Sequence, residues 1–306
     1  MGTGNRRTTL GITTFFVQMG QFIDHDLTLT PEESEPECCD ENRFGELWLF
    51  NENFDEDRCI PIRVPDDDRI WGRRGRTCFE VHRSAVALSI PDCEATPQRE
   101  QTDALTHFLD NSNVYGSTVM EARDVRDGRL LKINPKSPKI RGGGGRSVLP
   151  ACLTGNRNNN ACGGLCSEPA RSCKIAGDQR VNEQLGLTSH HTLWLREHNR
   201  LATALESLNT HWDEERIFQE ARRIVIAQWQ HIIYNEWLPI LLGQTYMTTF
   251  DLFPQTSGYS ESYNERLDPR INNEFATAAF RWAIHLHKIL DLFCNNKLSD
   301  RLAGDN

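Results

Sequence analysis

Hydrophobic residues near the start of the chain recur at the three- and four-residue spacing of an α-helix. This spacing predicts one helix from about Thr13 to Leu27. Pro31 prevents its continuation, because proline cannot donate the backbone hydrogen bond that another helical turn needs. The apolar positions that carry the pattern are Phe15, Phe16, Met19, Phe22 and Ile23.

Two longer apolar stripes predict the main helices of the second half of the chain. One covers residues 189–206, with Thr188 or Ser189 as N-cap, and the other runs from about Glu214 to Trp237, before Pro239. A further helix is predicted from Arg99 to near Leu109, followed by a polar loop. The fold class predicted from these elements is mainly α.

The stretch from Pro31 to about Pro97 has only short apolar patches, so it predicts a long surface region braced by disulfides. The sequence holds 10 cysteines, an even number that fits an oxidising compartment better than the cytosol. We expect local pairing: within 38/39/59, between 78 and 93, and within 152/162/166/173, with Cys294 left free or mispaired. Zinc at Cys162, Cys166 and Cys173 is disfavoured, because no fourth ligand completes the set.

Polar residues at the end of the first helix are candidates for chemistry. Gln21, Asp24 and His25 are three and four positions apart, so they project from one face. The side chain of Asp26 is rotated by about 100° around the helix axis from that of His25, so Asp26 can serve a different site. A His flanked by two carboxylates is costly to bury without partners, so the segment predicts a chemical site, with a solvated helix end as the alternative.

Two other segments carry candidate ligands or charges. From Thr106 to Ser112, a hydroxyl, a backbone carbonyl, a carboxylate and a second hydroxyl recur at every second residue, an arrangement that suits a hard cation such as Ca²⁺. An ion-free turn is the alternative for this loop alone. Arg180 and Glu183 are three positions apart and can share a direction, which also fits an ordinary surface ion pair.

Four separated stretches resemble, in the same order, the animal haem peroxidases of the peroxidase–cyclooxygenase superfamily. They are residues 20–26, 106–112, 176–202 and 268–281, and the resemblance covers roughly residues 12–281. It implies the animal haem-peroxidase fold, a helical core around a haem cleft with long disulfide-braced loops. It also implies a single domain over residues 1–306, which we expect to be incomplete and truncated at its C-terminus.

The resemblance implies that the chain is a peroxidase, with His25 as distal acid and base, Gln21 ordering the distal water, and Arg180 as the catalytic arginine. The side-chain chemistry agrees. A neutral imidazole can take a proton from hydrogen peroxide and return it, and a fixed guanidinium stabilises charge as the O–O bond breaks.

Haem b and Ca²⁺ are the implied cofactors. In the family, ester bonds tether haem from positions that match Asp24 and Glu183; some members add a sulfonium link from a following Met, where this chain has Gln184. The implied calcium ligands join the residue after the distal His to the polar loop. They are Asp26, Thr106, Phe108 through its carbonyl, Asp110 and Ser112.

The residue expected to bind the haem iron on its proximal side lies where this sequence stops resembling the family. The family places a His three residues after Arg281, but this position is Ile284. We expect His285 rather than His287 to take the role, although neither is in register, because one added residue rotates a helical ligand by about 100°.

Charge and hydropathy exclude two classes of partner. A net charge of −9, without a basic run, argues against nucleic acid, and no apolar run reaches the length of a membrane span. The resemblance implies a secreted protein that uses hydrogen peroxide to oxidise halides, phenols or tyrosyl groups. The alternatives are an inactive relative serving adhesion or matrix binding, and a truncated product that does not fold stably.

Overall fold

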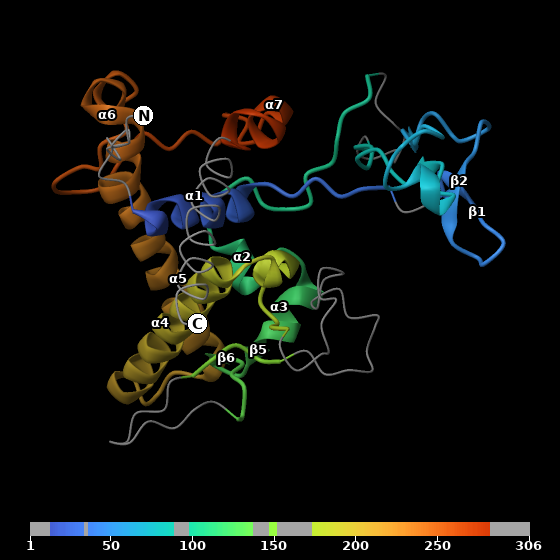
Figure 1. Ribbon diagram of the computed structural model, residues 1–306. Helices are drawn as coiled ribbons and strands as arrows, with labels where there is room; N and C mark the ends of the chain where they lie inside the picture. The colour runs from blue at the N-terminus through green and yellow to red at the C-terminus, as the bar shows by residue number, and fades with distance from the viewer. Residues whose placement is uncertain (1–12, 34–35, 89–97, 137–146, 152–172, 282–306) are drawn as a thin grey trace, which may run out of the picture. The chain divides into compact units, whose positions relative to one another are not determined.

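The computed structural model describes residues 13–33, 36–88, 98–136, 147–151 and 173–281. The chain divides into two compact units (Figure 1): unit 1 comprises Met1–Thr28 and Leu105–Asn306, and unit 2 comprises Leu29–Ala104. Unit 1 is built from helices and unit 2 from short strands and loops. The prediction of a mainly α fold is confirmed. The prediction of a single, incomplete domain over 1–306 stays a prediction.

Helix α1 spans Thr14–Leu27, close to its predicted limits. The Thr13 side chain caps it by accepting a hydrogen bond from the Phe16 backbone N–H. Except at its first turn, the helix is buried. At its centre Phe22 is fully buried, with its ring against His190, His191 and Trp229. The polar side chains of α1 are therefore buried because the helix itself runs through the core.

Helices α4 (Leu185–Leu208) and α5 (Glu214–Ile232) pack side by side (Figure 1). Helix α4 begins earlier than predicted, because Thr188 is not a cap. Its hydroxyl donates to the Val181 carbonyl and its backbone N–H to the Gln184 carbonyl, which places it inside the first turn. Asp213 caps α5 by accepting from the Arg216 N–H, where a negative charge favours the helix dipole.

The helical path predicted to end at Trp237 continues further. A π-helical turn, η4 (Ile233–Trp237), leads into α6 (Leu238–Thr249). Pro239 lies in the first turn of α6, directly after the π-helical turn. Inside α6, Gly243 has a φ of 75°, which kinks the helix.

Shorter elements complete unit 1. They are α2 (Ser112–Tyr115), α3 (Val119–Val125), the hairpin of β5 (Arg126–Asp127) and β6 (Leu130–Leu131), the 3₁₀ turn η3 (Gln179–Asn182), α7 (Asn273–Thr277) and the 3₁₀ turn η5 (Ala279–Arg281).

The helix predicted from Arg99 to Leu109 is wrong. The backbone groups of its first residues bond to other segments of unit 2 instead of to one another. The Glu100 carbonyl accepts from Ala87, the Thr102 N–H donates to Ala85, and the Ala104 N–H donates to Leu29. An extended segment with its backbone bonds used in this way cannot also close helical turns.

Unit 2 is a cystine-braced region, as predicted. Strand β1 (Cys39–Glu41) pairs with β2 (Leu47–Phe50), β3 (Ile62–Arg63) pairs with β4 (Cys78–Phe79), and η1 (Gly72–Arg74) is a 3₁₀ turn. Disulfides join Cys38 to Cys59 and Cys39 to Cys78. The predicted pairing of Cys78 with Cys93 is therefore wrong, because Cys39, the first residue of β1, is the partner of Cys78.

Other predicted cysteine pairings lie mostly beyond the described ranges. Cys93, Cys294 and most of the 152/162/166/173 group fall outside them, while Cys173 is disulfide-bonded. Among the helices that the structure describes, none combines the length and hydropathy needed to cross a membrane.

Candidate functional site

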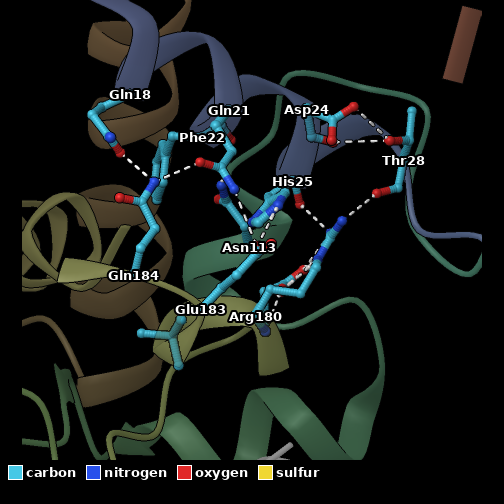
Figure 2. Close-up of polar contacts among 12 residues, drawn as sticks. Gln18, Gln21, Phe22, Asp24, His25, Thr28, Asn113, Arg180, Glu183 and Gln184 are labelled. Atoms are coloured by element: carbon cyan, nitrogen blue, oxygen red, sulfur yellow. Dashed lines mark hydrogen bonds and ion pairs between the residues drawn. The ribbon is translucent and has the colours of Figure 1, made fainter. Parts of the chain in front are cut away.

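The last two turns of α1 bury Gln21, Asp24 and His25 together. Their exposed fractions are 7%, 1% and 2%. The segment with Arg180 and Glu183, at η3, faces this part of the helix (Figure 2). The structure therefore brings the four residues Gln21, His25, Arg180 and Glu183 to one place, although about half the chain separates the two segments.

Arg180 is held in place by hydrogen bonds from all three nitrogens of its guanidinium group. Nη1 donates to the Thr28 carbonyl at 2.9 Å, and Nη2 donates to the His25 carbonyl at 3.3 Å. Nε and Nη2 also donate to the Asp178 carboxylate, with a shortest distance of 2.6 Å. The arginine thus binds carbonyls at the C-terminal end of α1, where a positive charge is favoured by the helix dipole.

Asp178 is the buried counterion of Arg180. Its carboxylate also accepts from the Arg180 backbone N–H at 2.7 Å, which caps η3. Burial alone would raise the pKa of Asp178, but the charge and hydrogen bonds of Arg180 outweigh it and lower the pKa to about 2. The pair therefore remains ionised at neutral pH.

Glu183 lies against the base and the amide of α1. Its Oε2 is 3.6 Å from His25 Nε2 and accepts a hydrogen bond from Gln21 Nε2 at 3.1 Å. The Glu183 side chain is 45% exposed, so it is accessible to a ligand from outside. Next to it, Gln184 donates to the side-chain oxygens of Gln18 and Gln21, which ties the start of α4 to α1 (Figure 2).

Asp24 points away from Glu183, toward the end of α1. Its Oδ1 accepts a hydrogen bond from the Thr28 hydroxyl at 2.8 Å. Figure 2 shows His25 between this carboxylate and Glu183. The two carboxylates thus lie on either side of the imidazole, one buried and one exposed.

Asp26 faces the opposite way, into the polar loop that precedes α2. Its Oδ1 accepts from the Ser112 hydroxyl at 3.2 Å, and its Oδ2 accepts from the Asn111 N–H at 3.2 Å. Asp110 is part of the same cluster, since its Oδ1 accepts from the Thr106 hydroxyl at 2.9 Å and from the Ser112 N–H at 3.0 Å. The Phe108 carbonyl accepts from the Asp110 N–H at 2.9 Å.

This cluster suits a cation. Burial, reinforced by the negative charge of Asp110, raises the pKa of Asp26 to about 7 despite the hydrogen bond from Trp229 Nε1 at 2.8 Å. Both side-chain polar atoms of Asn111 are buried and without a hydrogen-bond partner. Two neighbouring carboxylates, two hydroxyls and a carbonyl form an oxygen-rich donor set of the kind that Ca²⁺ binds.

Several contact residues were missed by the sequence analysis. Asp178 carried a signal, because an acidic residue just before an arginine-containing turn is a typical N-cap. Trp229 was assigned only to the buried stripe of α5, although a buried indole N–H needs an acceptor. Nothing in the spacing of Gln18 pointed to Gln184.

A family model described as animal haem peroxidase matches residues 2–301. The chain belongs to the animal haem peroxidase family. The resemblance found in the sequence is thereby confirmed, and the mainly helical fold agrees with it.

Individual relatives of this animal haem peroxidase chain are also peroxidases by name. It is 40% identical to chorion peroxidase of Aedes aegypti over 286 residues, which are 91% of this chain and 33% of the relative. It is 36% identical to peroxidasin of Drosophila melanogaster over 280 residues, which are 89% of this chain and 17% of the relative. The chain therefore spans a third or less of the length of these two proteins.

A solved structure shares the fold. Peroxidase A from Dictyostelium discoideum matches with a TM-score of 0.59 and 28% identity, covering 89% of this chain and 46% of that one.

The residues present fit the groups that the animal haem peroxidase family implies. Around His25, an imidazole, a fixed guanidinium and an exposed carboxylate form a donor set suited to haem and peroxide. The predicted iron ligand His285, like His287, lies outside the described residues.

Proposed function

We propose that this protein is a secreted haem peroxidase that uses hydrogen peroxide to oxidise a small reducing substrate such as a halide, a phenol or a tyrosyl group. The observation that carries this proposal is the meeting of His25, Arg180 and Glu183 at one end of α1. Haem b, when bound, supplies the redox-active iron at which peroxide is reduced.

His25 is the proposed acid and base. Its Nε2 faces Glu183, where it can take a proton from hydrogen peroxide and return it to the departing oxygen. The His25 carbonyl is held by Arg180, and Gln21 is held by Glu183 and Gln184, so the backbone and the neighbouring amide of the base are both fixed. Gln21 is proposed to orient water or peroxide beside the imidazole.

Arg180 is the proposed stabiliser of negative charge during O–O cleavage. Because a guanidinium does not lose its proton, its charge is constant, and Asp178 and the α1 carbonyls keep it in place. Preorganised charge of this kind avoids reorganisation during the reaction.

Glu183 and Asp24 are the residues proposed to hold haem covalently, and His285 to bind its iron. Exposure favours Glu183 as the readier attachment. Asp24 is the less accessible of the two, since its carboxylate is buried and its Oδ1 accepts a hydrogen bond from the Thr28 hydroxyl. The Glu183→Gln variant is therefore expected to lose more acid-resistant haem than Asp24→Asn when both are reconstituted with haemin.

Ca²⁺ is proposed to bind at Asp26, Thr106, Phe108, Asp110 and Ser112. Because Asp26 follows His25 directly, an ion there would fix the end of α1 and with it the base. Secretion is supported by the disulfides Cys38–Cys59 and Cys39–Cys78, since disulfides persist in an oxidising compartment.

Reconstitution of the chain with haemin tests the proposal. We expect a Soret band and peroxide-dependent oxidation of a phenol. His25→Ala should keep the Soret band and lose about 10²- to 10⁴-fold of the turnover. Turnover that survives His25→Ala would overturn the assignment of the base, and turnover that survives replacement of both His285 and His287 by Ala would overturn the assignment of the iron ligand.

A further inference from the structure

A second group of metal-ligand side chains lies in unit 2, apart from the residues proposed for catalysis. The Sγ atoms of Cys38 and Cys59 and a ring nitrogen of His82 all lie within 4.8 Å of one another. Both cysteines are fully buried, and the His82 side chain is 17% exposed. In the structure the two sulfurs form a disulfide, in which sulfur is a poor metal ligand.

Other oxygen atoms point to the same place. Glu80 Oε1 is 3.2 Å from His82 Nε2, and the Pro36 carbonyl is 3.1 Å from that nitrogen and 3.8 Å from each of the two sulfurs. The two sulfurs and the imidazole supply three of the four ligands of a tetrahedral zinc site, and Glu80, which contacts His82, is the neighbouring carboxylate that can supply the fourth.

The backbone around these ligands does not depend on the Cys38–Cys59 bond alone. Both Glu80 oxygens accept backbone N–H bonds, from Cys38 at 2.6 Å and from Cys39 at 2.8 Å. A β-bridge joins Cys59 to His82, and on either side of it the Ile60 N–H donates to the Val81 carbonyl and the Arg83 N–H to the Arg58 carbonyl. If the Cys38–Cys59 bond is reduced, these contacts still hold the four ligands near one another.

We propose that reduction of the Cys38–Cys59 disulfide creates a zinc site formed by Cys38, Cys59, His82 and Glu80. A two-electron reductant such as a phosphine or a dithiol breaks the S–S bond, and two protons make the two thiols. Zn²⁺ then displaces both thiol protons and binds two thiolates, the His82 imidazole and a Glu80 oxygen. The disulfide and the zinc site are mutually exclusive states of the same two sulfurs.

Alkylation of the full chain tests the site without any substitution. The chain is reduced with a phosphine, incubated with or without Zn²⁺, and treated with iodoacetamide, and the rate at each cysteine is read by peptide mass spectrometry. We expect zinc to slow the alkylation of Cys38 and Cys59 by at least about tenfold. Cys39 and Cys78, which are not part of this ligand group, are the internal control and should be protected little.

Two variants distinguish the proposed zinc ligands from the residues around them. His82→Ala should weaken zinc protection of Cys38 and Cys59 by about tenfold or more. The matched control, Cys39→Ser with Cys78→Ser, removes the neighbouring disulfide and should keep the protection. Equal protection of Cys38 and Cys78 by zinc, or protection of Cys38 and Cys59 that is unchanged in His82→Ala, would overturn the proposal.

Discussion

Two buried aspartates of unit 1 have pKa values shifted in opposite directions. Asp178 has a guanidinium against its carboxylate, which lowers its pKa to about 2. Asp26 has only neutral donors and a second carboxylate nearby, so burial raises its pKa to about 7. Whether a buried carboxylate is charged thus depends on its nearest partner, and the two residues should respond to pH with opposite signs.

The first prediction concerns calcium and pH at Asp26. Between about pH 4 and pH 7 the unfolded chain loses this proton while the folded, metal-free chain keeps it, so this group lowers the stability of the fold as pH rises. Ca²⁺ needs the ionised carboxylate, so its stabilising effect should grow from pH 5 to pH 7. The measurement is the difference in Tm between calcium and EDTA at each pH.

Substitutions sharpen this prediction. Asp26→Asn should abolish the calcium-dependent rise in Tm, whereas Asp127→Asn, at an exposed position of β5, should preserve it. A calcium effect of the same size at both pH values, or one that survives Asp26→Asn, would remove Asp26 from the site.

The second prediction concerns the Asp178–Arg180 pair. Asp178→Asn leaves a mostly buried guanidinium without its counterion, which typically costs about 3–5 kcal/mol in the free energy of unfolding. In the parent this stabilisation is complete above about pH 4 and is lost as pH falls toward about 2, because the folded pKa of Asp178 is lowered. Denaturant unfolding at pH 7 measures the loss.

The chain offers a matched control for that substitution. Asp268 and Arg270 form the same Asp-x-Arg pair, with a distance of 2.5 Å, but on the surface. Solvent screens an exposed pair, so Asp268→Asn should change the unfolding free energy little. Similar losses in the two variants would mean that burial of Asp178 is not what makes its pair important.

At the scale of elements, close backbone packing positions the Arg180 segment. A Cβ built on Gly177 would lie 2.4 Å from the Gly116 backbone nitrogen and 2.6 Å from the Val114 carbonyl carbon. The turn before η3 therefore packs directly on the backbone of α2. Only a residue without a side chain allows this approach.

The third prediction compares two glycines of this region. Gly177→Ala should destabilise unit 1 by about 1–3 kcal/mol, because the contacting atoms belong to backbone that cannot move aside. Gly186→Ala should cost less, because the nearest contact is the end of the Gln18 side chain and alanine is about 1 kcal/mol better than glycine in a helix. Thermal or denaturant unfolding ranks them, and the reverse order would contradict this account.

The elements differed in how well the sequence predicted them. Helix α1 was placed within one residue, because its apolar spacing and the later Pro31 both mark its limits. The segment Arg99–Leu109 was misassigned, because the backbone partners of its first residues are Leu29, Ala85 and Ala87, far away in the chain. Local patterns describe a helix that bonds to itself, but not a segment paired with distant residues.

At the scale of the whole molecule, local sequence patterns again identified residues of the candidate site but not all of their distant partners. Motif residues identified Gln21, Asp24, His25, Arg180 and Glu183, and the structure brings their segments together. The side chains that hold two of these residues are Asp178, which binds Arg180, and Thr28, which binds Asp24, and the fold brings them there. Cys39 pairs with Cys78 rather than staying in its local group, because the pairing of strands decides which cysteines meet.

The contacts of α1 with the rest of unit 1 also bear on the order in which the protein folds. Asp26 and Trp229 are 203 positions apart, and Gln21 and Glu183 are 162 apart. Helices α4 and α5, by contrast, are consecutive and joined by a short turn. Because closing a long loop costs entropy before its contacts form, the α4–α5 hairpin should assemble first and α1 should dock later.

The fourth prediction follows from this order. In pulse-labelled hydrogen exchange during refolding of the disulfide-intact chain, amides of α5 should become protected before those of α1. Haemin added during refolding should therefore bind only after the later phase, because His25 reaches Arg180 only when α1 docks. Simultaneous protection of both helices would show that α1 is part of the folding nucleus. With the expected order, the refolding chain passes through a state that has its main helices but in which His25 does not yet contact Arg180.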